Sequence, residues 1–144
     1  MEVVVAAGLA VVVFVAALDL SWRGLGLVEK ARRGFEEAAE LRNAAAWVTR
    51  DLRRAESIDW AASGSLSMQV WDSGGGWGMG TVVYELRDGV LVRDDMGWVK
   101  EVARGLERAD FCVEERDGGV LVTAEFAGKN GGRARTCVWV YTGS

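Results

Sequence analysis

The chain opens with an uninterrupted apolar run from Val3 to Leu18, and Glu2 is the one charged residue before it. The sixteen residues of this run would form a helix of about 24 Å, and continuing it to Trp22 gives about 33 Å. The hydrocarbon core of a bilayer is about 30 Å thick, and an aromatic residue followed by Arg23 is typical of the membrane surface. This pattern predicts a transmembrane helix segment over residues 1–22.

Two other interpretations of the apolar run are open at this point. A cleaved secretory signal would begin with a basic region and end in a small-x-small cleavage site, whereas this chain begins Met-Glu. A buried core helix is the second alternative, although a run of this length without a charge is long for one. Length and flanking residues favour the membrane anchor.

Residues 23–57 show the pattern of an amphipathic helix. Apolar side chains recur at steps of three and four residues, and charged side chains fill most positions between them. The apolar positions are Val28, Ala31, Phe35, Ala38, Leu41, Ala45, Val48, Leu52 and Ala55. Because these side chains are small or medium in size, the stripe suits packing against a sheet. We therefore expect a stalk helix that continues from the apolar segment.

Beyond Ser57 the apolar period changes to two, as in β-strands. Asp88-Gly89 and Asp117-Gly118 stand between alternating segments and have the sequence of hairpin turns. Residues 98–108 are expected to be a short helix or irregular. The pattern predicts an antiparallel β-rich globular domain over residues 58–144. The whole chain is thus expected to be α+β, with a long N-terminal helix, membrane-spanning in its first half and amphipathic in its second, packed on an antiparallel β-sheet.

Charge and composition narrow the function classes. The net charge is −4, and the residues from Ala55 onward include nine Lys or Arg and fourteen Asp or Glu. Nucleic-acid binding requires basic clusters, so an acidic domain argues against that partner. The chain has no histidine, and no acid, base and nucleophile form a recognisable set. We therefore expect no enzyme activity, no cofactor and no metal site. Calcium held by acidic loops stays open, although no EF-hand pattern is present.

Cys112 and Cys137 are the two cysteines, and both fall in the β-rich part. Two cysteines are too few for a structural zinc site. A disulfide between them would fit an oxidising compartment, and buried free thiols are the alternative. If the last three strands form a simple meander, the two cysteines lie about 10 Å apart, which is too far for a disulfide.

The glycine-rich stretch from Asp72 to Gly80 lacks the spacing of a phosphate-binding loop and precedes a strand pattern. One interpretation is a flexible hairpin loop. The other is a contact loop that presents Trp77 at its tip, as exposed aromatic residues do at interfaces.

Glu2 also has two interpretations, because a carboxylate at the head of a membrane helix costs free energy unless it is paired or reaches the surface. It could reach the surface with help from the helix dipole, or it could pair with a cation of a neighbouring subunit. The basic residues after the apolar run would place the domain in the cytoplasm by the positive-inside rule. These are Arg23, Lys30, Arg32 and Arg33.

The apolar segment EVVVAAGLAVVVFVAAL (2–18), the charged helix and RNAAAWVTRDLRRAESI (42–58) resemble the type IV pilin and type II secretion pseudopilin superfamily. RDLRRAESI (50–58), TVVYELRDGVLVRDD (81–95) and RARTCVWVY (133–141) are similar to the J-type minor pseudopilins. Mature chains of that family open Phe-Thr-Leu-x-Glu, so this sequence matches from the x position, with Glu2 as the family glutamate. A late start assignment would account for the missing leader and Phe-Thr-Leu, and N-terminal processing and methylation are expectations that depend on it.

The resemblance implies assembly rather than catalysis. A minor pseudopilin helps to initiate or cap a secretion pseudopilus or a pilus, and the family glutamate, here Glu2, pairs with the N-terminal amine of a neighbour. The implied partners are other minor and major pseudopilins or pilins, the bacterial inner membrane and a secreted protein substrate. The family's basic leader would outweigh Arg23 and place the domain in the periplasm or, at a pilus tip, outside the cell. The alternative function is a single-pass membrane-anchored binding or sensor protein with a periplasmic β-rich domain.

Overall fold

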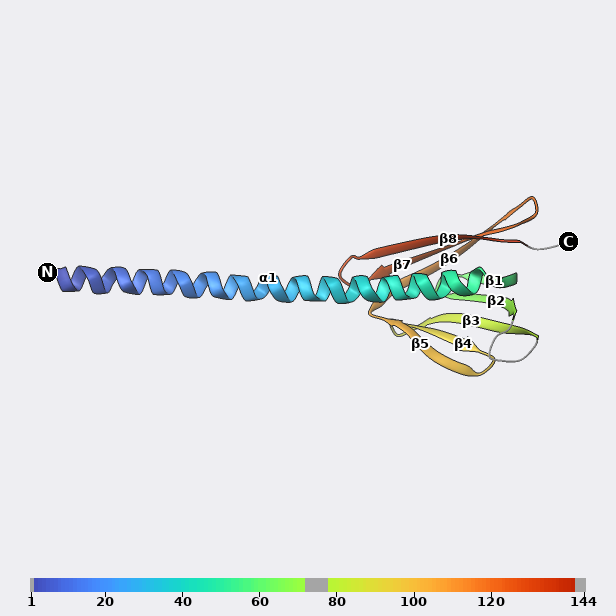
Figure 1. Cartoon of the computed structure of the whole chain (residues 1–144), viewed down its shortest axis with the longest axis horizontal. Helices are drawn as coiled ribbons and strands as arrows, with labels where there is room; N and C mark the ends of the chain where they lie inside the picture. Colours follow the sequence, from blue (N-terminus) through green and yellow to red (C-terminus); the bar gives the residue numbers. More distant parts are fainter. Residues whose placement is uncertain (1, 72–77, 142–144) are drawn as a thin grey trace. The chain divides into compact units, whose positions relative to one another are not determined.

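The computed structural model describes residues 2–71 and 78–141, with side chains described from Val13 onward. One long helix is followed by eight strands (Figure 1). The elements are α1 (Glu2–Leu52), β1 (Ala55–Ala62), β2 (Ser65–Trp71), β3 (Met79–Arg87), β4 (Val90–Asp95), β5 (Trp98–Arg104), β6 (Leu106–Arg116), β7 (Gly119–Gly128) and β8 (Arg133–Val140).

The chain divides into two units, Met1–Phe35 and Glu36–Ser144. The described part of the first unit is helix α1 alone, and its side chains from Val13 on are exposed except for a half-exposed Glu29. Among the described residues no helix is long and apolar enough to cross a membrane. The prediction that the first half of the helix spans a membrane is therefore wrong. The described part of the predicted span and the residue after it carry two charged side chains, since Asp19 and Arg23 form an ion pair of 2.8 Å.

The second unit, which we call the body, contains the end of α1 and two antiparallel sheets. One sheet has five strands in the order β1-β2-β3-β4-β5, and the other has three in the order β6-β7-β8. The two sheets meet at the bridge between Ser63 and Asp110, where the amide of Gly64 donates to the carbonyl of Ala109 at 2.6 Å. The class is thus α+β, but two sheets replace the single sheet that was expected.

The two predicted hairpins are confirmed. Asp88 and Gly89 both have positive φ, 50° and 79°, and join β3 to β4, which is the backbone that a tight two-residue hairpin requires. Gly118 has a φ of 86° at the turn between β6 and β7.

Two predicted boundaries are wrong. Helix α1 ends at Leu52 rather than near Ser57, because a turn at Arg53 and Arg54 redirects the chain into β1. The segment 98–108 is neither helical nor irregular, since it forms β5 and the start of β6. The sequence of β5 shows no alternation of apolar and polar residues, because β5 is an edge strand whose first four residues are all exposed. Trp98 is 83% exposed, and Val99 beside it is exposed as well.

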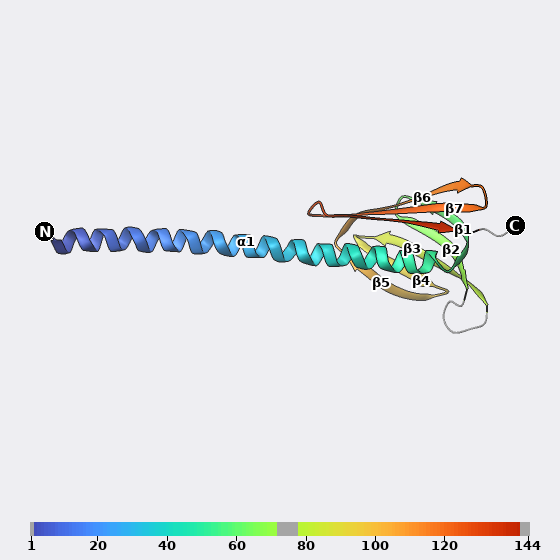
Figure 2. The same cartoon turned by 45° about the horizontal axis from the view of Figure 1, so that its top comes forward.

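The hydrophobic core lies where the end of α1 meets both sheets (Figure 2). From the helix it takes Leu41, Ala44, Val48 and Leu52, which follow one another at steps of three and four. Tyr84 of β3 and Phe126 of β7 are the largest fully buried side chains that the sheets contribute. The predicted apolar face of the helix is therefore confirmed for its second half, from Leu41 to Leu52.

Candidate functional site

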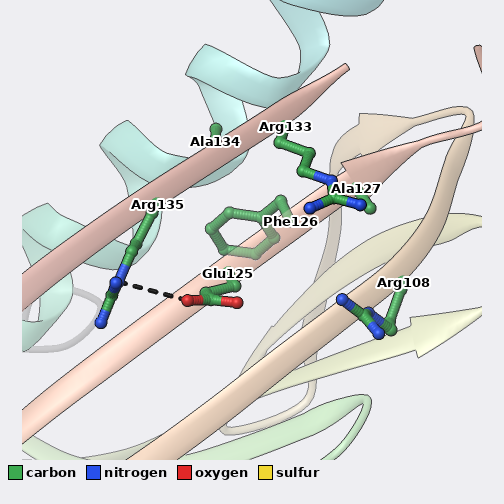
Figure 3. A pocket seen from close by; sticks show the side chains of 7 residues that line it. All are labelled: Arg108, Glu125, Phe126, Ala127, Arg133, Ala134 and Arg135. Atoms are coloured by element: carbon green, nitrogen blue, oxygen red, sulfur yellow. Dashed lines mark ion pairs between the residues drawn. The ribbon is translucent and has the colours of Figure 1, made fainter. Parts of the chain in front are cut away.

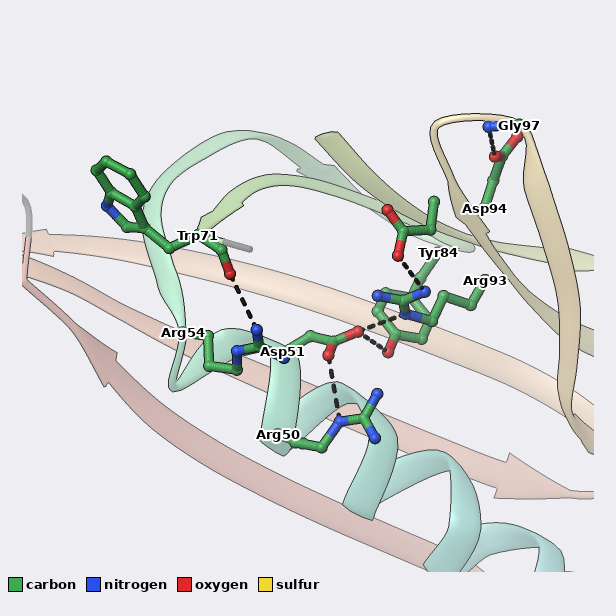
Figure 4. A network of polar contacts seen from close by, with 9 residues as sticks. Arg50, Asp51, Arg54, Trp71, Tyr84, Arg93, Asp94 and Gly97 are labelled. Carbon is green, nitrogen blue, oxygen red and sulfur yellow. Dashed lines mark hydrogen bonds and ion pairs between the residues drawn. The ribbon is translucent and has the colours of Figure 1, made fainter. Parts of the chain in front are cut away.

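The most completely buried charge in the described chain is Asp51, in the last turn of α1. Tyr84 Oη donates to Asp51 Oδ2 at 2.7 Å, and Arg93 Nε donates to the same oxygen at 2.6 Å (Figure 4). Arg50 Nε lies 3.4 Å from the other oxygen, Oδ1. A buried carboxylate is tolerated only when it is paired and hydrogen-bonded. These contacts therefore fix the end of the helix to β3 and β4.

Arg93 extends this network to a second carboxylate. Its Nη1 donates to Asp95 Oδ2 at 2.9 Å, so a single guanidinium serves two buried acids. Asp95 Oδ1 is buried and accepts no hydrogen bond within the described chain. Removal of Arg93 would leave both carboxylates without their strongest partner.

The pKa shifts of Tyr84 and Arg93 indicate a structural role for these two side chains. Burial raises the pKa of Tyr84, and the charge of Asp51 raises it further. Burial would lower the pKa of Arg93, but its hydrogen bonds to Asp51 and Asp95 and the charge of Asp51 outweigh that effect and raise the pKa. Neither group exchanges a proton near neutral pH, as a general acid or base must. The contacts are those of a fixed anchor.

Trp47, one helix turn before Asp51, contacts two cationic side chains. The guanidinium of Arg50 lies 4.0 Å from the centre of its ring system, and the ammonium of Lys100 lies 4.2 Å from it. Cations over an indole face attract it through the ring quadrupole. Trp47 thereby links the helix to the edge strand β5.

Two carboxylates near the start of the body hold the turns of the sheets against the helix. Glu37 Oε1 accepts the amide of Asn130 at 2.7 Å, and Glu40 Oε2 accepts the amide of Arg104 at 2.9 Å. Gly128 and Gly132 leave room for Glu37, since a Cβ at either position would press on its carboxylate.

The outer face of the three-stranded sheet carries a hollow of about 240 Å³ that is lined by three arginines (Figure 3). Register places Arg108, Ala127 and Arg133 side by side on β6, β7 and β8. Arg135 lies on the next outward position of β8 and pairs with Glu125 at 3.2 Å. The small side chain of Ala127 leaves open space between longer neighbours. This arrangement could hold an anionic group.

The cysteines lie on the same outer face, one position further along. Cys112 pairs in register with Thr123, and Thr123 pairs with Cys137. The β6-β7-β8 meander is the arrangement in which the two were expected to be about 10 Å apart. Both cysteines are free and exposed, so the structure favours free thiols, although these are not buried. Thr123 Oγ1 lies 3.5 Å from Cys137 Sγ.

Two predicted site residues are not tested. Glu2 is the first residue of α1, but its side chain lies outside the described part, so its pairing with a neighbouring subunit stays a prediction. Trp77 lies outside the described residues altogether. The contact-loop hypothesis therefore stays open.

The sequence did not predict the polar anchor or the arginine hollow. The sequence analysis did not single out Asp51, because no local pattern distinguishes it from exposed acids of the same helix such as Glu36. The arginines of the hollow come from strands that pair only in the folded sheet. The alternation Arg133, Arg135, Cys137 and Trp139 was a usable signal, because it predicts one face of a strand.

No group of three or more His, Cys, Asp or Glu within the described part of the chain could hold a metal ion. Comparisons with protein-family models, curated proteins and solved structures found no match. The resemblance to pilins and pseudopilins therefore rests on the sequence features alone.

Proposed function

We propose that this protein is a structural subunit of the pilin and pseudopilin kind, which helps to initiate or cap a pseudopilus or pilus. Its helix α1 would pack beside the helices of other subunits, and its body would lie in the periplasm or outside the cell. The observation that carries the proposal is the exposed apolar surface of the helix in the first unit, together with the family resemblance of the sequence.

The exposed apolar side chains of this helix are numerous. They are Val13, Phe14, Val15, Leu18, Leu20, Trp22, Leu25, Leu27, Val28 and Phe35. Leu20 is 72% exposed and Leu27 is 69% exposed, which is far more than a single helix in water tolerates without a partner. A surface of this kind indicates an interaction that covers it.

One stripe of this helix suits close packing with another helix. Leu20, Gly24, Leu27, Ala31 and Phe35 follow one another at steps of three and four, so they lie along one side. A Cβ built on Gly24 meets no atom within 4 Å, so this position is open to a partner. Alternation of large and small side chains lets one helix insert into the grooves of another.

The other side of the same helix offers a matched control. Glu29 follows Leu20 by nine residues, which is two and a half turns, so the two point in opposite directions. Arg33 Nε donates to Glu29 Oε1 at 3.1 Å in an exposed ion pair. Exposed pairs of this spacing contribute only about 0.3–0.5 kcal/mol.

The test is photo-crosslinking of the full chain in its native host. A photoreactive residue at Leu27 should give crosslinks to helices of other pilin-like subunits, identified by mass spectrometry, and the same residue at Arg33 should give at least tenfold fewer. Leu20→Gln with Leu27→Gln should abolish co-purification with those subunits. Glu29→Gln with Arg33→Gln, which also leaves net charge unchanged, should preserve it. Equal crosslinking at both positions, or crosslinks to no pilin-like protein, would contradict the proposal.

A further inference from the structure

We propose that the outer face and free edge of the three-stranded sheet bind single-stranded nucleic acid, with arginines on the phosphates and aromatic side chains on the bases. This activity goes beyond the assembly role and does not depend on it. The site consists of the arginine hollow, the groove beside β8 and the aromatic end of β8.

The hollow supplies the first phosphate position. Its guanidinium groups come from Arg108, Arg133 and Arg135, on two neighbouring rungs of the sheet (Figure 3). Arg108 Nε is paired with Asp110 at 2.7 Å and Arg135 Nε with Glu125 at 3.2 Å. The side chain of Arg133 has no ion pair or hydrogen bond among the described residues. Each guanidinium has five N–H donors, so the paired arginines keep donors for an added anion.

A second hollow continues the positive surface around the edge of the sheet. It lies between the end of α1 and β8 and is lined by Arg50, Arg53, Arg54 and Arg135, with small side chains and no carboxylate. Arg135 lines both hollows. Six arginines thus line the two hollows, on the outer face of the sheet and around its β8 edge, although the chain has a net charge of −4. Net charge alone does not reveal this clustering.

The aromatic side chains lie further along the same face. Outward positions of β8 alternate from Arg133 and Arg135 through Cys137 to Trp139, and Tyr141 follows. The rings of Trp139 and Tyr141 are 6.2 Å apart between centroids, and Tyr141 is 77% exposed. Bases of single strands stack on such side chains without regard to sequence, while a basic groove follows the backbone.

Two simpler explanations cover part of this surface. Arg50, Arg53 and Arg54 lie at the helix C-terminus, where cations are favoured by the helix dipole. Charges on an edge strand such as β8 also discourage aggregation. Neither explains Arg108 on the far strand β6, nor the exposed ring of Tyr141 in line with the arginines. An acidic peptide would satisfy the arginines, but it would leave the aromatic pair unused, and this favours nucleic acid.

The test measures binding of the full chain to a fluorescein-labelled oligodeoxythymidine of about 20 nucleotides by fluorescence anisotropy. Arg133→Glu with Arg135→Glu should raise Kd at least tenfold. It should also make the slope of log K against log salt shallower by about 1.4, since each single-strand phosphate contact contributes about 0.7. Arg87→Glu with Arg104→Glu is the control, because it changes net charge equally on the other sheet, and it should change Kd less than threefold.

The aromatic arm separates nucleic acid from other polyanions. Tyr141→Ala should raise Kd for the oligonucleotide by about fivefold or more, the range for loss of one stacked base. It should leave binding of polyphosphate unchanged. Equal weakening by both arginine pairs would overturn the proposal, because only net charge would then act. A poly-glutamate peptide that binds as tightly as the oligonucleotide, with no effect of Tyr141→Ala, would also overturn it in favour of an acidic protein partner.

Discussion

At the scale of single residues, the join between helix and sheet depends on Asp51. Its carboxylate is fully buried, and it is held by one phenol and one guanidinium from neighbouring strands. Loss of a partner from a buried pair of this kind is strongly destabilising, because the remaining charge has no compensation. The same contacts fix the protonation states of Tyr84 and Arg93, and this gives a pH dependence that can be measured.

Stability should fall in alkaline solution through Tyr84. Burial and the charge of Asp51 raise its pKa in the folded state, whereas a tyrosine of the unfolded chain has a pKa of about 10. The folded state therefore keeps a proton that the unfolded state loses. Its contribution is fully present below pH 10 and declines above it by up to about 1.4 kcal/mol per pH unit. Urea unfolding between pH 8 and 11 would show this decline.

Tyr84→Phe is expected to lower the free energy of unfolding by about 1.5–3 kcal/mol at pH 7, because Asp51 loses a hydrogen bond. It should also flatten the decline above pH 10. The chain has only one other tyrosine, so Tyr141→Phe is a natural control that should leave both quantities unchanged. A decline of equal steepness in wild type and Tyr84→Phe would show that other groups cause it.

The sequence predicted the buried apolar residues of this region better than its polar ones. Leu41, Val48 and Leu52 follow the helical period, and all three are buried. In the sequence, Asp51 looks like any other charged residue of the helix. Its partners Tyr84 and Arg93 lie more than thirty residues further along the chain. A local pattern shows which side chains avoid water, but not which distant donors will meet a buried acceptor.

At the scale of elements, hairpin turns were predictable and edge strands were not. Asp88-Gly89 specifies its own backbone, because both residues can adopt positive φ, and the structure gives it 50° and 79°. The β5 strand has no such signal, since its exposed residues follow no alternation. The end of α1 was also placed too late, because Ala55 continues the helical period by coincidence while it begins β1.

Strand register decides the chemistry of the cysteines. Cys112 and Cys137 lie on either side of Thr123, and strands two positions apart are separated by about 10 Å. A disulfide needs Cα atoms within about 7 Å. We therefore expect iodoacetamide to alkylate both cysteines of the folded, unreduced protein, with two adducts per chain by mass spectrometry.

Prior reduction should not change that number of adducts. Thr123→Val serves as a control for the neighbouring hydroxyl, since it should leave the number at two. A folded protein that takes up no alkylating agent until it is reduced would show that β6, β7 and β8 do not pair in this order.

At the scale of the whole molecule, the hydrophobic core that the described residues form lies in the second unit. Every residue of the hydrophobic core comes from the body, from Leu41 onward. The described helix of the first unit contributes no side chain to that core. The predicted order of elements, a long helix followed by a β-rich part, is confirmed. It did not show that the helix enters the core only through its final turns.

A fragment of residues 36–144 should fold like the full chain. We expect its thermal midpoint, followed by circular dichroism, to lie within about 2 °C of the full chain, because a loss of 1 kcal/mol would shift it by about 4–8 °C. A fragment of residues 46–144 is the matched control. It lacks Leu41 and Ala44, as well as Glu37 and Glu40, and it should lose several kcal/mol or fail to fold. Equal midpoints for the two fragments would show that the start of the body helix is dispensable.

The exposed edge strand β5 has a practical consequence for handling the protein. Trp98 and Val99 stand exposed on a strand that pairs on one side only, and such borders recruit strands from other molecules. Lys100 and Glu101, also exposed on this strand, act as gatekeepers that repel a stacked neighbour. Aggregation of concentrated preparations should begin at Trp98. Trp98→Lys should reduce this aggregation and leave the hydrophobic core unchanged.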